Sequence, residues 1–297
     1  MNKKDIRALV VIWIVGTLMA FLTAALVYAA YPGGSLPEGS APTAETATTS
    51  WINAPASPVA DSVRVNFAWT IAVIFPFLYA PIMTLIYCIF RFSREKNPNA
   101  DQFHEHVPLE VAWTILPALI LVAMAVPAYQ VLVLMEKRPT NPDVVLDITG
   151  HQFFWSYNFP KYDVSVTDDG TGRSPVLLPV DKDVLLKGTA SQVNHAWFVP
   201  AFGVKFDVLP GRTTTSWVRP NSQGLFKGQC AELCGALHAY MWIHVKVVPE
   251  KEFYAWLKEK GATFPPDEAA RISQLLGEEV EVTAAPAPGD TLALAAK

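Results

Sequence analysis

The segment that says most about the fold and chemistry of this chain reads Gly228-Gln-Cys-Ala-Glu-Leu-Cys-Gly-Ala-Leu-His-Ala-Tyr-Met241. It brings together Cys230, Cys234, His238 and Met241. Thiolates, imidazoles and thioethers are ligands that copper prefers, and the thioether discriminates because zinc gains little from it. Two cysteines allow two copper ions to be bridged by both sulfurs. In such a centre the charge change on electron transfer is spread over both metals, so the surroundings rearrange little.

The same loop leaves a zinc site and a disulfide open as alternatives. His195, in the β-rich stretch before the loop, could complete a Cys2His2 zinc site with Cys230, Cys234 and His238, but the methionine would then have no role. A disulfide between the two cysteines is conceivable outside the membrane, as an oxidised form without metal. With three cysteines in the chain, a disulfide framework is not expected. Three further histidines match no ligand spacing, and we interpret them as ordinary: His104, His106 and His244.

The sequence around the loop consists of short β-type runs separated by turn residues, starting at residue 143. Several short strands at this spacing predict an antiparallel sandwich or barrel. Residues 250–260 follow with the pattern of an amphipathic helix whose apolar face holds Phe253, Trp256 and Leu257. The strands that we expect cover residues 144–149, 153–159, 176–179, 184–187, 213–218 and 243–248.

The N-terminal half carries three apolar segments, over about residues 8–30, 65–90 and 111–135. Each is long enough to cross a hydrocarbon core of roughly 30 Å as a helix, and the prolines inside the last two are tolerated in membrane helices. Basic residues mark the inner side of a membrane. Residues 31–63 contain no Lys or Arg. Basic residues stand instead before the first segment and after the second, at Lys3, Lys4, Arg7, Arg91, Arg94 and Lys96. The third segment therefore delivers the C-terminal half to the outer face.

The composition agrees with a membrane protein and excludes several other classes. Charged residues make up 17% of the chain, below the roughly 25% of soluble domains. The 11% of aromatic residues favours a packed core over disorder, collagen or a coiled coil. The net charge of −4 disfavours nucleic acid as a partner because it repels phosphate.

We expect five parts along the chain. The basic start, the apolar run and the small residues at its end make residues 1–31 a signal peptide or, because the run is long, an extra transmembrane helix. Residues 32–63, rich in Pro, Gly, Ser and Thr, form an external linker. Residues 64–135 form a transmembrane helical hairpin and residues 136–262 the globular outer domain. Residues 263–297 form a largely disordered tail with a weakly helical piece, because its Ala/Pro-rich end lacks a core.

Four motifs, found in the order in which the family has them, make the chain resemble subunit II of cytochrome c oxidase, a haem–copper oxidase. The resemblance covers about residues 64–260 and implies a two-helix hairpin followed by an all-β, cupredoxin-like sandwich that holds a dinuclear CuA centre. The motifs are Leu109-Glu-Val-Ala-Trp-Thr-Ile-Leu-Pro117, Gly150-His-Gln-Phe-Phe-Trp-Ser-Tyr157, the segment from His195 to Arg212 and the loop from Cys230 to Met241.

The resemblance also implies a set of ligands. The side chains that match the family's copper ligands are His195, Cys230, Cys234, His238 and Met241. Glu232 matches the residue whose backbone carbonyl completes the site, and its carboxylate matches a ligand of a magnesium ion shared with subunit I. The cofactors implied are thus two copper ions and one magnesium ion.

Three further positions receive roles from the family. Glu110 stands at the start of the third apolar segment, where a solvated acid interacts favourably with the helix dipole. The resemblance implies another role, as the entrance of a proton pathway. Phe153 stands where the family has the tryptophan that accepts electrons on the docking face, and Trp155 is a substitute bridge or a core residue. Gln192 stands where the family commonly has Asp, which removes a negative charge from the face that steers a basic partner.

By resemblance, the chain accepts electrons from cytochrome c or another periplasmic carrier at the copper centre. It passes them to haem in subunit I, where oxygen is reduced to water with proton pumping. Subunit I, subunit III and the electron donor are the partners implied. The location implied is the inner membrane of a bacterium, crossed several times, with the C-terminal domain on the periplasmic side. The alternatives are the CuA subunit of a nitric oxide reductase of the same architecture and a non-enzymatic copper-binding membrane protein.

Overall fold

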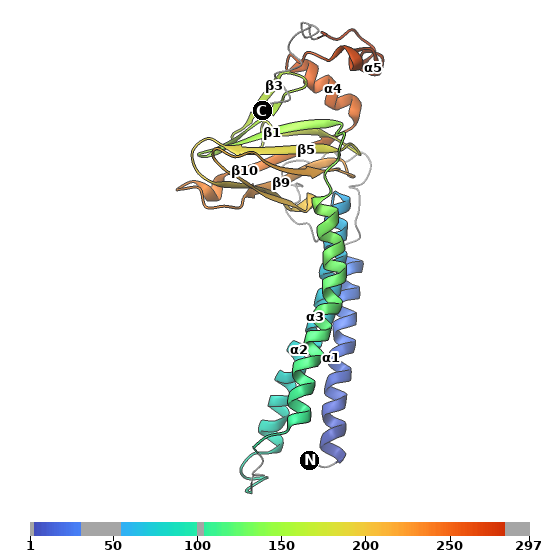
Figure 1. Ribbon diagram of the computed structural model, residues 1–297, viewed down its shortest axis with the longest axis vertical. Helices are drawn as coiled ribbons and strands as arrows, with labels where there is room; N and C mark the ends of the chain where they lie inside the picture. Colours follow the sequence, from blue (N-terminus) through green and yellow to red (C-terminus); the bar gives the residue numbers. More distant parts are fainter. Residues whose placement is uncertain (1–2, 31–54, 100–103, 283–297) are drawn as a thin grey trace. The chain divides into compact units, whose positions relative to one another are not determined.

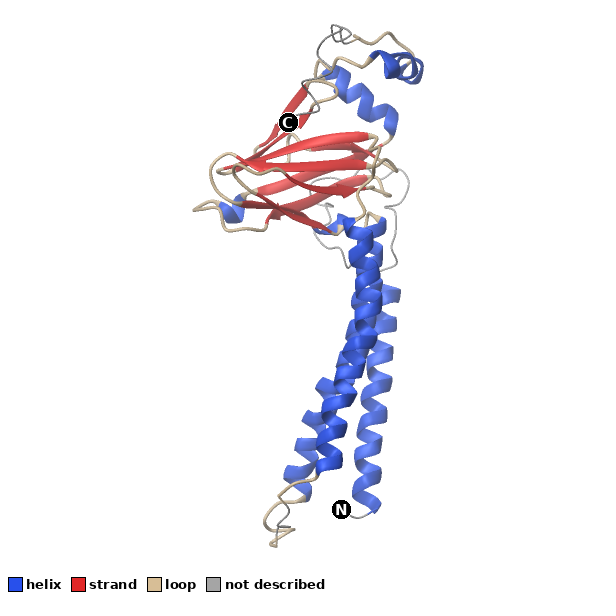
Figure 2. Ribbon diagram, viewed as in Figure 1, coloured by secondary structure: helices blue, strands red, loops and turns tan. Residues whose placement is uncertain are grey.

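The computed structural model describes residues 3–30, 55–99 and 104–282. The chain divides into two compact units, one of residues 1–32 and 62–134 and the other of residues 33–61 and 135–297. The described strands all belong to the second unit, whereas the first contains helices (Figures 1 and 2). The two units therefore differ in class, as the change of sequence pattern near residue 135 predicts.

The helical unit contains α1 (Lys3–Ala30), most of α2 (Pro58–Arg91) and most of α3 (Val107–Glu136). Among the described residues, α2 and α3 are long and apolar enough to span a membrane, while α1 contains a shorter apolar helical stretch, Arg7–Met19. No residue of α3 is buried within the protein, and an apolar helix without protein cover suits lipid. The prediction of two apolar helices that can span a membrane before the β domain is confirmed. The interpretation of residues 1–31 stays a prediction.

The second unit is a sandwich of two five-stranded sheets. Buried and partly exposed residues alternate along β1 and β5, as expected for strands with one face on a core. The first sheet has the order β3 (Val164–Asp168), β2 (Phe154–Phe159), β1 (Val144–His151), β5 (Val184–Ala190) and β8 (Thr214–Val218). The second has the order β4 (Val176–Pro179), β10 (Trp242–Val248), β9 (Gly224–Cys230), β6 (His195–Val199) and β7 (Val204–Val208).

The sandwich confirms the predicted fold class but differs from the expected strand pattern in two ways. The sheets are mixed, because β1 pairs with β5 and β10 pairs with β4 in parallel. The expected strands also omitted β3, β6, β7 and β9. Strand β9 shows why, since its glycines and polar residues weaken the local preference for a strand while pairing with β10 and β6 stabilises it.

The C-terminal end of the domain corrects the boundary expected at residue 262. Helix α4 (Glu250–Glu259) matches the predicted amphipathic helix, with Phe253 and Leu257 fully buried. Beyond it, Phe264 is fully buried and α5 (Pro266–Leu276) buries Ile272 in the same core. Residues 263–276 are thus part of the packed domain, because the weak helix finds an apolar surface to cover. Residues 283–297 lie outside the described residues.

The N-terminal side of the sandwich is joined by the segment before α2. Ala56 N donates to Ala201 O at 2.7 Å, and its carbonyl accepts from Asn221 N at 3.0 Å. Ser57 Oγ donates to Phe202 O at 2.7 Å. Part of the expected linker, residues 32–63, therefore packs on the domain and starts helix α2, while residues 31–54 lie outside the described residues.

Candidate metal centre

The loop from Cys230 to Met241 is the connection between two hairpin strands. Strand β9 ends at Cys230, and β10 begins one residue after Met241. Cys230 N donates to Met241 O at 3.0 Å and closes the base of the loop. The hairpin brings the first cysteine and the methionine together, although ten residues separate them in the sequence.

His195 reaches the same place from a neighbouring strand. It is the first residue of β6, which pairs with β9 so that Trp197 lies opposite Cys230. The imidazole is fully buried, and its Nδ1 lies 3.7 Å from Cys230 Sγ. The ligating atoms of His195, Cys230 and Cys234 lie within 4.8 Å of one another. The structure thus brings His195 next to Cys230, although the strands β7 and β8 lie between them in the sequence.

The potential ligands form two matched halves. Cys230 Sγ lies 3.7 Å from His195 Nδ1 and 3.3 Å from the Glu232 carbonyl oxygen. Cys234 Sγ lies 3.5 Å from His238 Nδ1 and 3.8 Å from Met241 Sδ. The two sulfurs are 3.9 Å apart, well beyond the roughly 2.05 Å of a disulfide. Each sulfur therefore has one imidazole and one weak donor beside it, a set that suits two ions bridged by both sulfurs.

The surroundings of Cys234 and His195 favour the neutral forms of these two side chains until a metal binds. Burial, together with the neighbouring Cys230, raises the pKa of the Cys234 thiol from 9.0 to about 12. Burial lowers the pKa of His195, and the charges of His151 and His238 lower it further. A neutral imidazole is the form that binds metal, whereas the thiols must lose protons. Metal binding at this site therefore releases protons.

Packing from β1 and β2 holds the ring of His195. His195 Nε2 makes no hydrogen bond to any described residue, so packing contacts hold this side of the ring. The fully buried Trp155 meets it edge-on, with ring centroids 5.7 Å apart. A Cβ placed on Gly150 would lie 2.8 Å from His195 Cδ2. Only glycine at residue 150 leaves room for the imidazole, a role that the sequence pattern did not reveal.

The aromatic segment before β2 supports the loop from another side. Gln152 Nε2 donates to Cys234 O at 2.6 Å, and a Cβ on Gly235 would lie 3.0 Å from ring atoms of Phe153. Phe153 therefore lies against the metal loop and is only partly buried. Phe154 stacks on His151, with centroids 4.5 Å apart, and is more exposed. Sequence reasoning missed the contribution of Gln152.

The two acidic residues singled out from the sequence lie in different units. Glu232 is exposed, so its carboxylate faces away from the cluster that its carbonyl joins. Glu110 lies in the first turn of α3, where its Oε1 accepts from His106 N at 3.2 Å, while His106 Nδ1 accepts from Leu109 N at 3.2 Å. These reciprocal bonds cap the helix, so His106 and Glu110 both have a structural role at its start.

Fold and site together define a class of membrane-anchored protein whose β-sandwich holds a metal site of thiols, imidazoles and a thioether. The chain belongs to the cytochrome c oxidase subunit II family. The family model described as "Cytochrome C oxidase subunit II, transmembrane domain" matches residues 45–131, and that described as "Cytochrome C oxidase subunit II, periplasmic domain" matches residues 168–248. The predicted resemblance is confirmed, and helix α1 lies outside both matches.

Curated relatives support the same assignment. Cytochrome c oxidase subunit 2 of Cereibacter sphaeroides is 35% identical over 242 residues, which cover 70% of this chain and 80% of that protein. Probable cytochrome c oxidase subunit 2 of Rickettsia felis is 32% identical over 226 residues, which cover 70% of this chain and 71% of that protein. The chain is therefore a subunit of a haem–copper terminal oxidase, an oxidoreductase complex, and its copper domain receives electrons from a partner.

Two similar solved structures contain periplasmic domains of subunit II. The domain from Bradyrhizobium japonicum is 36% identical to this chain. The match covers 41% of this chain and 95% of that domain, with a TM-score of 0.39. A mixed disulfide intermediate between a thioredoxin-like protein and subunit II of cytochrome c oxidase contains a domain that is 35% identical, covers 41% of this chain and 93% of that one, and has a TM-score of 0.38.

Proposed function

We propose that the cluster binds two copper ions as a CuA centre and that the chain is the electron-accepting subunit of its oxidase. The observation that carries this proposal is the matched pair of donor sets around the two sulfurs, each with one imidazole Nδ1 and one weak donor. The side-chain ligands would be His195, Cys230, Cys234, His238 and Met241, with Glu232 contributing its backbone carbonyl. A zinc site would use the thiols and imidazoles but not the buried thioether.

The protein prepares this site by burial and by strand pairing. Copper held by Cys230, Cys234, His195, His238 and Met241 would supply a centre that accepts and releases one electron. Cys230, Cys234 and Met241 are buried and keep water away from the sulfur atoms. Strands β6 and β9 fix His195 and Cys230 through their ladder. Ligands that are held in place before electron transfer need little rearrangement during it, which is what rapid transfer requires.

Two aromatic residues offer a route by which electrons approach. Phe153 lies at the surface of the metal loop, and Trp155 packs on His195. We propose that the electron donor, cytochrome c or another periplasmic carrier, docks over Phe153. A phenyl ring can fill the contact but lacks an indole N–H. Since Gln192 replaces an acid, we infer that docking depends less on charge than in relatives that carry Asp there.

The electrons then leave for haem in subunit I, where oxygen is reduced to water with proton pumping, and subunit III completes the set of proposed partners. The exposed carboxylate of Glu232 is free to bind a magnesium ion shared with subunit I. Glu110, at the exposed start of α3, would take up protons at the entrance of a pathway. In this arrangement the chain crosses the bacterial inner membrane more than once, with its C-terminal domain in the periplasm.

Purification of the intact oxidase with this chain tests the copper assignment. We expect two copper ions per chain beyond those of subunit I, and loss of both in Cys230→Ser. Cys88→Ser is the matched control, because Cys88 is a free cysteine of α2 and is not among the grouped potential ligands His195, Cys230 and Cys234, and it should leave the copper content unchanged. One zinc ion per chain in place of the two copper ions would overturn the proposal. Oxygen uptake with reduced cytochrome c as the donor tests the proposed electron route.

A further inference from the structure

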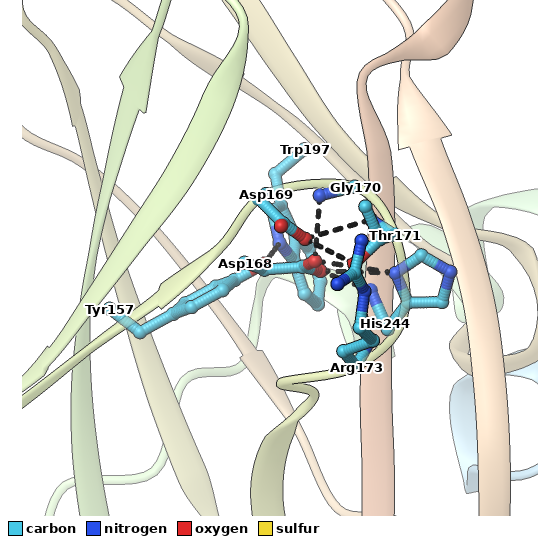
Figure 3. Close-up of polar contacts among 8 residues, drawn as sticks. All are labelled: Tyr157, Asp168, Asp169, Gly170, Thr171, Arg173, Trp197 and His244. Atoms are coloured by element: carbon cyan, nitrogen blue, oxygen red, sulfur yellow. Dashed lines mark hydrogen bonds and ion pairs between the residues drawn. The ribbon is translucent and has the colours of Figure 1, made fainter.

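A buried hydrogen-bonded pair of side chains lies beside the metal loop and involves a histidine that the sequence pattern left without a role. Asp168, the last residue of β3, is fully buried, and His244 on β10 is 5% exposed. Asp168 Oδ2 accepts from His244 N at 2.8 Å and lies 3.2 Å from His244 Nδ1 (Figure 3). A buried carboxylate is costly unless it is paired. This pair therefore links the end of β3 firmly to β10.

The turn after Asp168 lies against the backbone on both sides of Met241. Asp168 Oδ1 accepts from Gly170 N at 2.9 Å, which folds the chain back (Figure 3). Gly170 has a φ of +78°, and a Cβ there would lie 3.0 Å from Tyr240 O and 3.5 Å from Trp242 N. The turn thus contacts the residues directly before and after Met241, and the approach is close enough to require glycine.

The charge of the same carboxylate also acts on Tyr157, which is hydrogen-bonded to a residue of β6. Tyr157 is buried and its hydroxyl accepts from Trp197 Nε1 at 3.3 Å (Figure 3). Burial, with the charge of Asp168, raises the pKa of Tyr157 well above its usual value. Trp197 in turn lies opposite Cys230 in the β6–β9 pairing. Asp168 therefore bonds to β10, which follows the metal loop, and its charge acts on Tyr157, the hydrogen-bond partner of Trp197.

We propose that Asp168 and His244 are positioning residues that hold the thioether of Met241 at the copper centre. The inference rests on the proposed copper site. Met241 ends the loop, its carbonyl accepts from Cys230 N, and the turn that Asp168 folds lies against the backbone directly before and after it. Its Sδ lies 3.8 Å from Cys234 Sγ without any strand pairing of Cys234 itself. Loss of the pair would let the end of the loop move and would change the thioether contact before the other ligands.

The test compares Asp168→Ala and His244→Val with Met241→Leu in the intact oxidase. Groups that orient metal ligands through a second contact commonly change metal affinity by about 10- to 100-fold. We expect both variants to lose copper to a competing chelator at about tenfold lower chelator concentration. Their electron paramagnetic resonance and near-infrared spectra should change in the same direction as those of Met241→Leu. Asp169→Ala is the matched control, because Asp169 is on the same turn but exposed and bonds only to Thr171 among the hydrogen bonds described.

A double variant separates action through Met241 from general weakening of the fold. If Asp168 acts through the thioether, Asp168→Ala combined with Met241→Leu should resemble Met241→Leu alone, because residues that act as one unit are not additive. Additive effects, or native spectra in Asp168→Ala, would overturn the proposal. Should Asp168→Ala fail to assemble, Asp168→Asn keeps the size and one acceptor oxygen. It should give a smaller spectral change in the same direction, and an unchanged spectrum would be equally decisive against the proposal. If the oxidase proves to hold no copper at this loop, the failure is that of the copper assignment and is visible in the unmodified protein.

Discussion

We expect Gly150→Ala to disturb the copper site while the rest of the fold stays intact. The added Cβ would lie 2.8 Å from Cδ2, 2.9 Å from Cγ and 3.2 Å from Cβ of His195. Carbon atoms in contact prefer about 3.5–4.0 Å, so the imidazole or strand β1 must move by roughly 1 Å. The ring has no hydrogen bond at Nε2 to a described residue that would return it to its place, and Nδ1 therefore moves relative to Cys230 Sγ.

The size of the effect follows from the cost of overpacking. Inserting a methyl group into a close-packed core costs about 1–3 kcal/mol. If this cost destabilises the copper-bound form and not the copper-free form, it corresponds to roughly a 5- to 150-fold loss of affinity for copper. His195 is fully buried between Trp155 and the metal loop, so little of the strain can be relieved by turning the ring outward.

The assay measures copper content, the near-infrared absorption of the centre and thermal unfolding of the intact oxidase. Gly203→Ala is the control at the other end of β6. There φ is +64° and an added Cβ would lie 3.0 Å from the backbone of Ala60, so it strains the fold away from the site. We expect Gly203→Ala to lower stability with a native copper spectrum and Gly150→Ala to alter the spectrum. The reasoning is refuted if Gly150→Ala binds copper normally with an unchanged spectrum.

Three further predictions concern charge, metal and donor. Glu250 bonds to Arg271 and Lys182, which lower its pKa below 4.5 against the effect of burial. Glu250→Gln should therefore cost up to about 1 kcal/mol at pH 7, and the difference in thermal unfolding from the wild type should vanish as the pH falls below 4.5. Removal of copper by a chelator should lower the free energy of unfolding by about 3 kcal/mol, relative to protein in free copper at 100 times its Kd. Calorimetry measures this difference. Phe153→Trp should raise the rate of electron transfer from a mitochondrial-type cytochrome c in stopped-flow measurements, and an unchanged rate would place electron acceptance elsewhere.

The sequence predicts the parts of this protein that depend on local pattern. Apolar length identifies the helices α2 and α3, and the Cys230–Met241 spacing identifies the loop, because ligands close in sequence on one hairpin must lie close in space. The amphipathic helix α4 follows from the spacing of Phe253 and Leu257. These features need no knowledge of which strands pair.

What the sequence could not predict depends on pairing between distant segments. The parallel neighbours of β1 and β10 are set by the order of strands in each sheet, which no local pattern encodes. Gly150 matters because β1 lies under His195, and His244 was interpreted as ordinary although Asp168 meets it from 76 positions away. Neither Asp168 nor His244 stands out in the sequence. Their role is recognised only in the structure, where both are buried and bonded to each other.

The two halves of the metal site are supported in different ways, and this difference explains why the extra contacts lie where they do. Cys230 and His195 belong to paired strands, so the ladder between β6 and β9 positions them. Cys234 and Met241 belong to the loop, outside the named strands, and Met241 has one backbone bond at the base of the loop, from Cys230 N to its carbonyl. Gln152 bonds to the Cys234 carbonyl, and the Asp168 turn contacts the backbone around Met241. In the proposed copper centre both halves must stay in place during electron transfer, and in the loop half these side-chain contacts supply the support that strand pairing gives the other half.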